Sequence, residues 1–268
     1  MIYKKFKCSA IHNLIITKEN NSEELNEGIV IPTQILEKTN LFDGQEVIIT
    51  KIGAGNWKNR IKTFIIENKF NNEVEIRGSL TQFLKKGDLT CLIAECYMDE
   101  KTFKDYKNDE YAIFDLGFDP QNNIDNTKST LDLQYYSHKE KNVLITSKIF
   151  KEQIKKRTNL LKVFAQSIII GLTVNQTHPD CLQGSAELPK SIMKEAGLYE
   201  YKSVSVYNAT LGGVADTYSV PMPEGVVMTT GAMASFANIG NNVNIVGFVL
   251  SENPVSKKIV ITKDNKKC

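Results

Sequence analysis

The sequence has no run of about 18 apolar residues, and its N-terminal segment has no apolar core followed by a small-residue cleavage site. A spanning helix and a secretory signal are both unsupported by this pattern. Lys and Arg number 33 against 31 Asp and Glu, a formal net charge of +2, which is too balanced to indicate a nucleic-acid or membrane surface. We therefore expect a soluble protein with no nucleic-acid or membrane partner.

Cysteine and histidine are also scarce. The five cysteines are odd in number and have no CxxC spacing, so the sequence supports neither a disulfide framework nor a zinc site. The three histidines are far apart and lack metal-ligand spacing, so we expect no metal. A reducing cytoplasm is the simplest location. The histidines are His12, His138 and His178.

Short β-branched and apolar runs dominate what is present, and they predict strands. The runs lie at 14–17, 46–52, 62–66, 91–97, 203–207, 242–250 and 258–262. Two short helices are expected at 32–40 and 189–197, each opening with a proline, the second closing on Gly197. The fold class is therefore mainly β with short helices.

An internal repeat organises these elements. Segments in the first part of the chain match later segments in the same order: 32–50 with 189–207, 62–64 with 216–218, and 78–89 with 231–242. We therefore expect two β-rich units, at 1–98 and 161–268. The Asn-, Asp- and Lys-rich stretch 99–160 is interpreted as a connector.

The order of elements and several motifs resemble the pyruvoyl-dependent aspartate 1-decarboxylase family, whose members are small six-stranded double-psi β-barrels. The most specific motifs are "GS" at 184–185, "NATLGGVADTYSV" at 208–220 and the "GA.A" turn at 231–234. The first unit contributes "IH" at 11–12, "GIVIP" at 28–32 and "GNWKNRIKTF" at 55–64. The resemblance implies two tandem double-psi barrels.

The resemblance also implies chemistry at Gly184 and Ser185. In this family the serine attacks the preceding carbonyl, and elimination and hydrolysis leave a pyruvoyl group that forms an imine with the substrate amine. Thr217 would donate a hydrogen bond to the developing oxyanion, and Tyr218 would be a proton donor. Glycine is expected because it tolerates strained backbone angles. The covalent cofactor would thus derive from Ser185, and the reaction would be decarboxylation of an amino acid.

The first unit departs from this pattern but retains other family positions. Its Gly28 is followed by Ile29, which has no hydroxyl, and Phe64 replaces the tyrosine. Arg60 and His12 match family residues that bind substrate, as do Gly231 and Ala232 in the second unit. Family active sites lie between neighbouring barrels of a tetramer. The two units are therefore expected to divide the roles across their internal interface, and two chains to form a pseudo-tetramer.

One departure concerns the substrate. The family's substrate-binding lysine is replaced by Ala10 in the first unit, which leaves the amino acid open: aspartate or a related one. Two alternatives to the self-processing decarboxylase remain. The first alternative is a catalytically silent barrel protein that binds or regulates a partner. The second is a substrate-recognition module.

Overall fold

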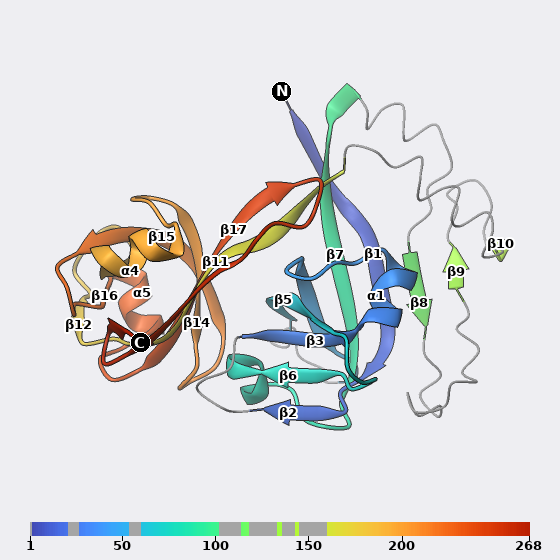
Figure 1. Ribbon diagram of the computed structural model, residues 1–268, viewed down its shortest axis with the longest axis horizontal. Coiled ribbons are helices and arrows are strands. Elements are labelled where there is room, and N and C mark those ends of the chain that lie inside the picture. The colour runs from blue at the N-terminus through green and yellow to red at the C-terminus, as the bar shows by residue number, and fades with distance from the viewer. Residues whose placement is uncertain are drawn as a thin grey trace.

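The computed structural model describes residues 2–20, 27–53, 60–101, 114–117, 133–135, 143–144 and 160–268. Most of these residues lie in strands, and the helices are short, which confirms the mainly β fold class. In Figure 1 the first half of the chain (residues 2–117) is blue to green and the second half (residues 160–268) is yellow to red. The halves lie side by side, and β11 and β17 reach from the second toward the first.

The first half contains eight strands, one α-helix and one 3₁₀ helix in the parts described: β1 (Tyr3–Ile15), β2 (Lys18–Asn20), β3 (Gly28–Pro32), α1 (Thr33–Thr39), β4 (Glu46–Lys51), β5 (Arg60–Asn68), β6 (Glu75–Arg77), η2 (Gly78–Gln82), β7 (Leu89–Asp99) and β8 (Phe114–Gly117). Two short strands follow: β9 (Leu133–Tyr135) and β10 (Val143–Leu144). β8 lies within the stretch that the sequence assigns to the connector, yet it pairs with β1.

The second half repeats the order of the first: β11 (Leu161–Thr173), β12 (Gln176–His178), β13 (Ala186–Pro189), α4 (Lys190–Ala196), β14 (Ser203–Asn208), β15 (Val214–Met222), β16 (Met228–Thr230), α5 (Gly231–Phe236), β17 (Asn242–Ser251), β18 (Lys258–Lys263) and β19 (Lys266–Lys267). The expected helix stop is present, because Gly197 caps α4 with a left-handed φ of 69°.

Strand pairing follows one scheme in both halves. β1 pairs antiparallel with β7 and parallel with β8, just as β11 pairs with β17 and β18. β3 pairs parallel with β5 and antiparallel with β6, as β13 does with β15 and β16. β4 bridges β5 and β7, as β14 bridges β15 and β17. The shared scheme assigns each position in one half a counterpart in the other.

Each half buries its own apolar core. β7 alternates buried and half-buried residues along its length, the period of two that a strand with one covered face requires. The first core is built around residues such as Ile29, Ile49 and Leu92, and the second around Leu188, Val206 and Ile245. Separate cores on one pairing scheme are what two repeated units predict.

A third apolar cluster joins the halves. Phe64 of β5 is fully buried against five residues of the second half: Ala165, Ile168, Ile170, Tyr207 and Val246. β7 also pairs with β11 through Tyr97 and Leu161, so the junction is continuous with the sheet. Lys62 adds an ion pair to Asp216 across the junction, with 2.8 Å between Nζ and Oδ2. The halves are therefore packed together rather than loosely tethered.

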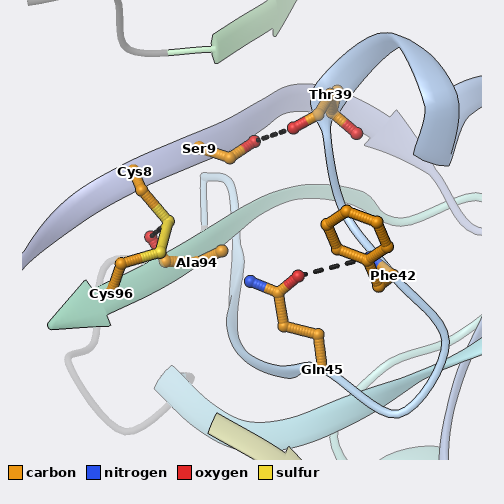
Figure 2. Close-up of a disulfide and its surroundings, with 7 residues drawn as sticks. All are labelled: Cys8, Ser9, Thr39, Phe42, Gln45, Ala94 and Cys96. Carbon is orange, nitrogen blue, oxygen red and sulfur yellow. Dashed lines mark hydrogen bonds between the residues drawn. A yellow bond between two sulfur atoms is a disulfide. The ribbon is translucent and has the colours of Figure 1, made fainter. Parts of the chain in front are cut away.

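The expectation of no disulfide is wrong for one cysteine pair. Cys8 of β1 and Cys96 of β7 form a disulfide across 88 residues of sequence (Figure 2). Both residues are buried, and Cys8 sits at an irregularity in the β1–β7 ladder. Spacing along the chain did not reveal this pair because only the folded ladder brings the two residues together. Cys91, Cys181 and Cys268 take no part in a disulfide.

Within the described ranges, the helices are too short and too polar for any of them to cross a membrane.

Candidate active site at Gly184 and Ser185

The peptide bond between Gly184 and Ser185 lies just before β13, among hydrogen-bonding side chains. The hydroxyl of Thr217 in β15 donates to the Gly184 carbonyl oxygen at 2.7 Å. Both Ser185 and Thr217 are 7% exposed, so this hydrogen bond is shielded from water. A donor on a carbonyl oxygen polarises the C=O bond and stabilises the negative charge that develops there on nucleophilic attack.

The Ser185 side chain has two further partners. Its Oγ lies 2.7 Å from Oγ1 of Thr230, and it donates to Oε1 of Glu187 at 3.1 Å. Thr230 also accepts from the Ser185 backbone N–H at 3.0 Å and donates to the Gln183 carbonyl at 2.8 Å. These bonds hold the nucleophilic hydroxyl beside a carboxylate that is able to accept its proton.

Sheet register explains why these side chains converge. Parallel pairing of Ala186 with Ser219 brings Thr217 alongside Gly184, and antiparallel pairing of Ala186 with Thr229 brings Thr230 alongside Ser185. Sequence reasoning missed Thr230 and Glu187. Alternation along an extended strand would have placed Glu187 on the Ser185 face, and Thr230 directly precedes the Gly231 turn.

The expected reason for glycine at 184 is not supported. Gly184 is absent from the glycines with left-handed φ. A Cβ added there would lie 3.4 Å from the Met233 nitrogen and 3.6 Å from the Ala232 nitrogen, which is ordinary contact. Neither backbone strain nor crowding therefore requires glycine. The proximity does place Ala232, one of the predicted substrate-binding residues, next to the Gly184–Ser185 bond.

The first half offers no equivalent nucleophile, although the register differs from the expected one. In the first half Gly28 lies opposite Arg77, and at the same place in the second half Ser185 lies opposite Thr230. The counterpart of Ser185 is therefore Gly28, not Ile29. A Cβ at Gly28 would approach the Phe64 carbonyl oxygen to 2.9 Å. Thr63, the counterpart of Thr217, has a buried hydroxyl without a hydrogen-bond partner in the described structure. The nucleophile and the polarised carbonyl are both missing here.

Comparison with known proteins decides the family. A model of the aspartate decarboxylase family matches residues 1–117 and 161–268. The chain belongs to this family. The first matched segment runs to the end of β8, and the second covers the half that contains Ser185. Family membership supports amino-acid decarboxylase activity, which makes the chain a lyase.

Individual family members match parts of the chain. Aspartate 1-decarboxylase of Pyrobaculum islandicum is 34% identical over 86 residues, which are 31% of this chain and 72% of that protein. The Thermotoga sp. enzyme of the same name is 34% identical over 84 residues, 31% of this chain and 74% of that protein. The Campylobacter jejuni enzyme is 33% identical over 66 residues, 24% of this chain and 52% of that protein. Each match is shorter than one half of the chain.

Of the remaining predicted site residues, Tyr218 and Arg60 have no described contact with Ser185. Tyr218 follows Thr217 on the opposite face of β15 and is 56% exposed. Arg60 is exposed at the start of β5, where it pairs with Thr50. His12 lies in β1 opposite Gly117, and its side chain is outside the described structure. Gly231, by contrast, lies close to the Gly184–Ser185 bond: it opens α5 with a φ of 51°, and a Cβ there would lie 3.0 Å from the Gln183 carbonyl oxygen.

The acidic residue next to Thr217 on β15 is held by an ion pair. Asp216, directly before Thr217, accepts from Ser205 at 2.6 Å and from Lys62 at 2.8 Å. Burial lowers the Lys62 pKa, but Glu46 and Asp216 outweigh this effect and leave it raised, so Lys62 stays protonated. Asp216 is thus a structural carboxylate, whereas the carboxylate on the Ser185 hydroxyl belongs to Glu187.

Proposed function

We propose that the chain is a self-processing, pyruvoyl-dependent decarboxylase of aspartate or a related amino acid, with its cofactor derived from Ser185. The observation that carries this proposal is the 2.7 Å hydrogen bond from Thr217 to the Gly184 carbonyl oxygen, beside a serine hydroxyl that is bound to Thr230 and Glu187. The first half lacks both features. Family membership supplies the reaction class.

Maturation uses groups that the second half holds in place. The Ser185 Oγ attacks the Gly184 carbonyl carbon and passes its proton toward Glu187. The attack forms the new C–O bond and a tetrahedral oxyanion; as this adduct collapses to the ester, the C–N bond breaks and the Ser185 nitrogen leaves as an amine that takes up the proton passed toward Glu187. Loss of the Ser185 α-proton expels the Gly184 carboxylate and leaves dehydroalanine, and water converts this group to a pyruvoyl group and ammonia. Thr217 stabilises the oxyanion in the first step.

The residues around Ser185 suit the mature group. Thr230 and the backbone near Ala232 surround the new N-terminus of the second fragment, and polar donors there are able to orient a carbonyl. When present, the pyruvoyl carbonyl supplies the electron sink that decarboxylation requires. The protein's own contribution is to bind the amino acid, exclude water and hold a proton donor in place, a role that we assign to Tyr218.

In an assembly of two chains, the predicted substrate-binding residues Arg60 and His12 would reach this site. This follows from comparing the strand register of the two halves. Ile170 and Val214 of the second half contact the first half at the junction. The counterpart of Ile170 is His12, because Ile170 pairs with Ile261 as His12 pairs with Gly117. The counterpart of Val214 is Arg60, because Val214 pairs with Tyr207 as Arg60 pairs with Thr50. A second chain docked in the same manner would bring His12 and Arg60 to Ser185.

This assembly revises the expected division of labour. Within one chain, the part of the first half that packs against the second half is the part that contains Gly28, the counterpart of Ser185. This internal junction therefore has no serine that is able to start processing. We propose that the two halves arose by tandem duplication and that a homodimer, a pseudo-tetramer of four units, contains two working sites. Each site would combine Ser185 of one chain with Arg60 and His12 of the other.

Intact mass spectrometry of the purified protein tests the proposal. Processing predicts fragments of residues 1–184 and 185–268. A single full-length species after prolonged warming would contradict it and favour the catalytically silent barrel.

A further inference from the structure

Glu27, at the junction between the halves, is a carboxylate that the proposed reaction does not use. It precedes β3, and its side chain is completely buried. By strand register it is the counterpart of Gly184, because Gly28 is the counterpart of Ser185. A side chain is thus present in the first half where the second half has none.

The Glu27 carboxylate is bound on both oxygens. The Ser79 backbone N–H lies 3.0 Å from Oε1 and 2.8 Å from Oε2, and the Ser79 hydroxyl donates to Oε2 at 2.9 Å. From the second half, Nδ2 of Asn244 in β17 donates to Oε1 at 2.8 Å. The Asn244 amide is oriented independently, because its Oδ1 accepts from the Gly171 N–H at 2.9 Å.

The space around the carboxylate is fitted to it. Gly78 has a φ of 58°, and a Cβ at this position would lie within 2.5 Å of the Glu27 carboxylate carbon and both of its oxygens, so glycine is required for the group to enter. Among the described residues, the hydrogen-bond partners of Glu27 are neutral donors. The nearby Tyr207 phenol is itself buried, and its pKa is raised by burial and by Glu46, Glu27 and Asp216.

Burial sets the protonation behaviour of Glu27. Desolvation raises its pKa to about 7, against the lowering effect of the Asn244 and Ser79 hydrogen bonds. When Glu27 is protonated, the Ser79 hydroxyl is able to accept a hydrogen bond from the carboxylic acid O–H, so both forms retain hydrogen bonds. The surroundings therefore accommodate a carboxyl group in either protonation state, and they do so through neutral hydrogen-bonding groups rather than through an ion pair.

We propose that Ser79 and Asn244 form a pocket for a small carboxylic acid at the junction of the halves, and that Glu27 is its built-in ligand. The carboxyl group closes the first half's counterpart of the Ser185 site and fastens that half to β17. This inference concerns the junction alone, and it holds whether or not Ser185 is processed.

The direct test empties the pocket and refills it with acetate. Glu27→Ala should lower the melting temperature, because the Ser79 and Asn244 donors lose their acceptor and a cavity remains. Added acetate at about pH 6, at constant ionic strength, should raise the melting temperature of this variant progressively, since a ligand that binds only the folded state stabilises it. Wild type should show no acetate-dependent rise, and neither should Glu67→Ala, which removes a carboxylate at a different place, on β5.

If the Glu27→Ala protein folds and its melting temperature does not change when acetate is added, the proposal is wrong. Chloride at equal concentration is the control for ionic effects.

A second set of variants decides the matter if Glu27→Ala does not fold. Asn244→Asp keeps the acceptor for Gly171 but sets two carboxylates against each other, so its melting temperature should fall at about pH 8. Adding Glu27→Gln should restore most of this loss, because the new amide is able to donate to the new carboxylate. A change from Glu27→Gln that is the same in the wild-type and Asn244→Asp backgrounds would show that positions 27 and 244 are uncoupled, and would contradict the pocket.

Discussion

At the scale of single residues, the two halves differ at a few positions that decide their chemistry. Ser185 and Thr217 in the second half correspond to Gly28 and Thr63 in the first. Only the second half has both a hydroxyl at the Ser185 position and a threonine that donates to the preceding carbonyl. The sequence predicted Gly184, Ser185 and Thr217 from motifs. It did not predict Thr230, because its partners depend on which residue of β16 faces β13.

Removing either hydroxyl should therefore have different effects on cleavage. Ser185→Ala should give a folded, uncleaved chain, because only the attacking group is lost. Thr217→Ala should slow cleavage by roughly 10²-fold, the usual cost of one oxyanion donor. Time courses by mass spectrometry measure both, with Thr63→Ala as the matched control. Normal kinetics in Thr217→Ala would show that its hydrogen bond to Gly184 plays no part in processing.

Glu27 should give wild-type stability a distinct dependence on pH. Its folded pKa of about 7 lies above the ordinary 4.5, so the folded state binds the extra proton between these values. The resulting stability is fully present below pH 4.5 and is lost as pH rises through 7, by roughly 3 kcal/mol in total. Denaturant unfolding of wild type and Glu27→Gln across this range should show that stability falls more steeply with rising pH in wild type than in the variant. Parallel curves would assign the slope to other groups.

At the scale of elements, alternation and turn residues made only part of the second half predictable, and β11, its longest strand, was missed. β14, β17, β18 and α4 lie where the apolar runs and Gly197 indicate. β1 was largely missed, because its first residues are rich in lysine and its pairing with β7 outweighs their weak strand preference. The position of β8 beside β1 was not predicted either, since a long gap separates the two strands in sequence.

The disulfide between β1 and β7 is a second element-scale feature that pairing alone reveals. A cross-link over 88 residues restricts the unfolded chain, so breaking it should cost about 2–4 kcal/mol. Denaturant unfolding with and without dithiothreitol should show this loss in wild type. Cys96→Ser should be less stable and insensitive to the reductant. An unchanged midpoint in reduced wild type would contradict a stabilising role.

At the scale of the whole molecule, repetition accounts for both the fold and the proposed assembly. The sequence predicted a repeat and two units, and the two halves share one pairing scheme, but the sequence did not predict how the halves face each other. Phe64 is buried at the junction, whereas its counterpart Tyr218 is exposed. An exposed aromatic residue whose counterpart is covered by a neighbouring unit is what an open end of a ring of units predicts.

Mixed dimers test this arrangement. Ser185→Ala and Arg60→Ala chains, purified separately, should each turn over amino acids poorly, the second despite normal cleavage. A hybrid of the two contains one intact site if Ser185 and Arg60 come from different chains, so it should recover about half of wild-type carbon dioxide release. A hybrid as inactive as its parents would place both residues within one chain or remove Arg60 from the site.

The N-terminal group of the fragment 185–268 tests the central claim most directly. Self-processing through Ser185 predicts a fragment that carries a carbonyl instead of an amine. It should be lighter than the hydrolysed peptide by the mass of ammonia, should resist Edman degradation, and should gain two hydrogens on borohydride reduction. A fragment that begins with an ordinary serine amine, or a chain that never separates at Gly184, would contradict the account.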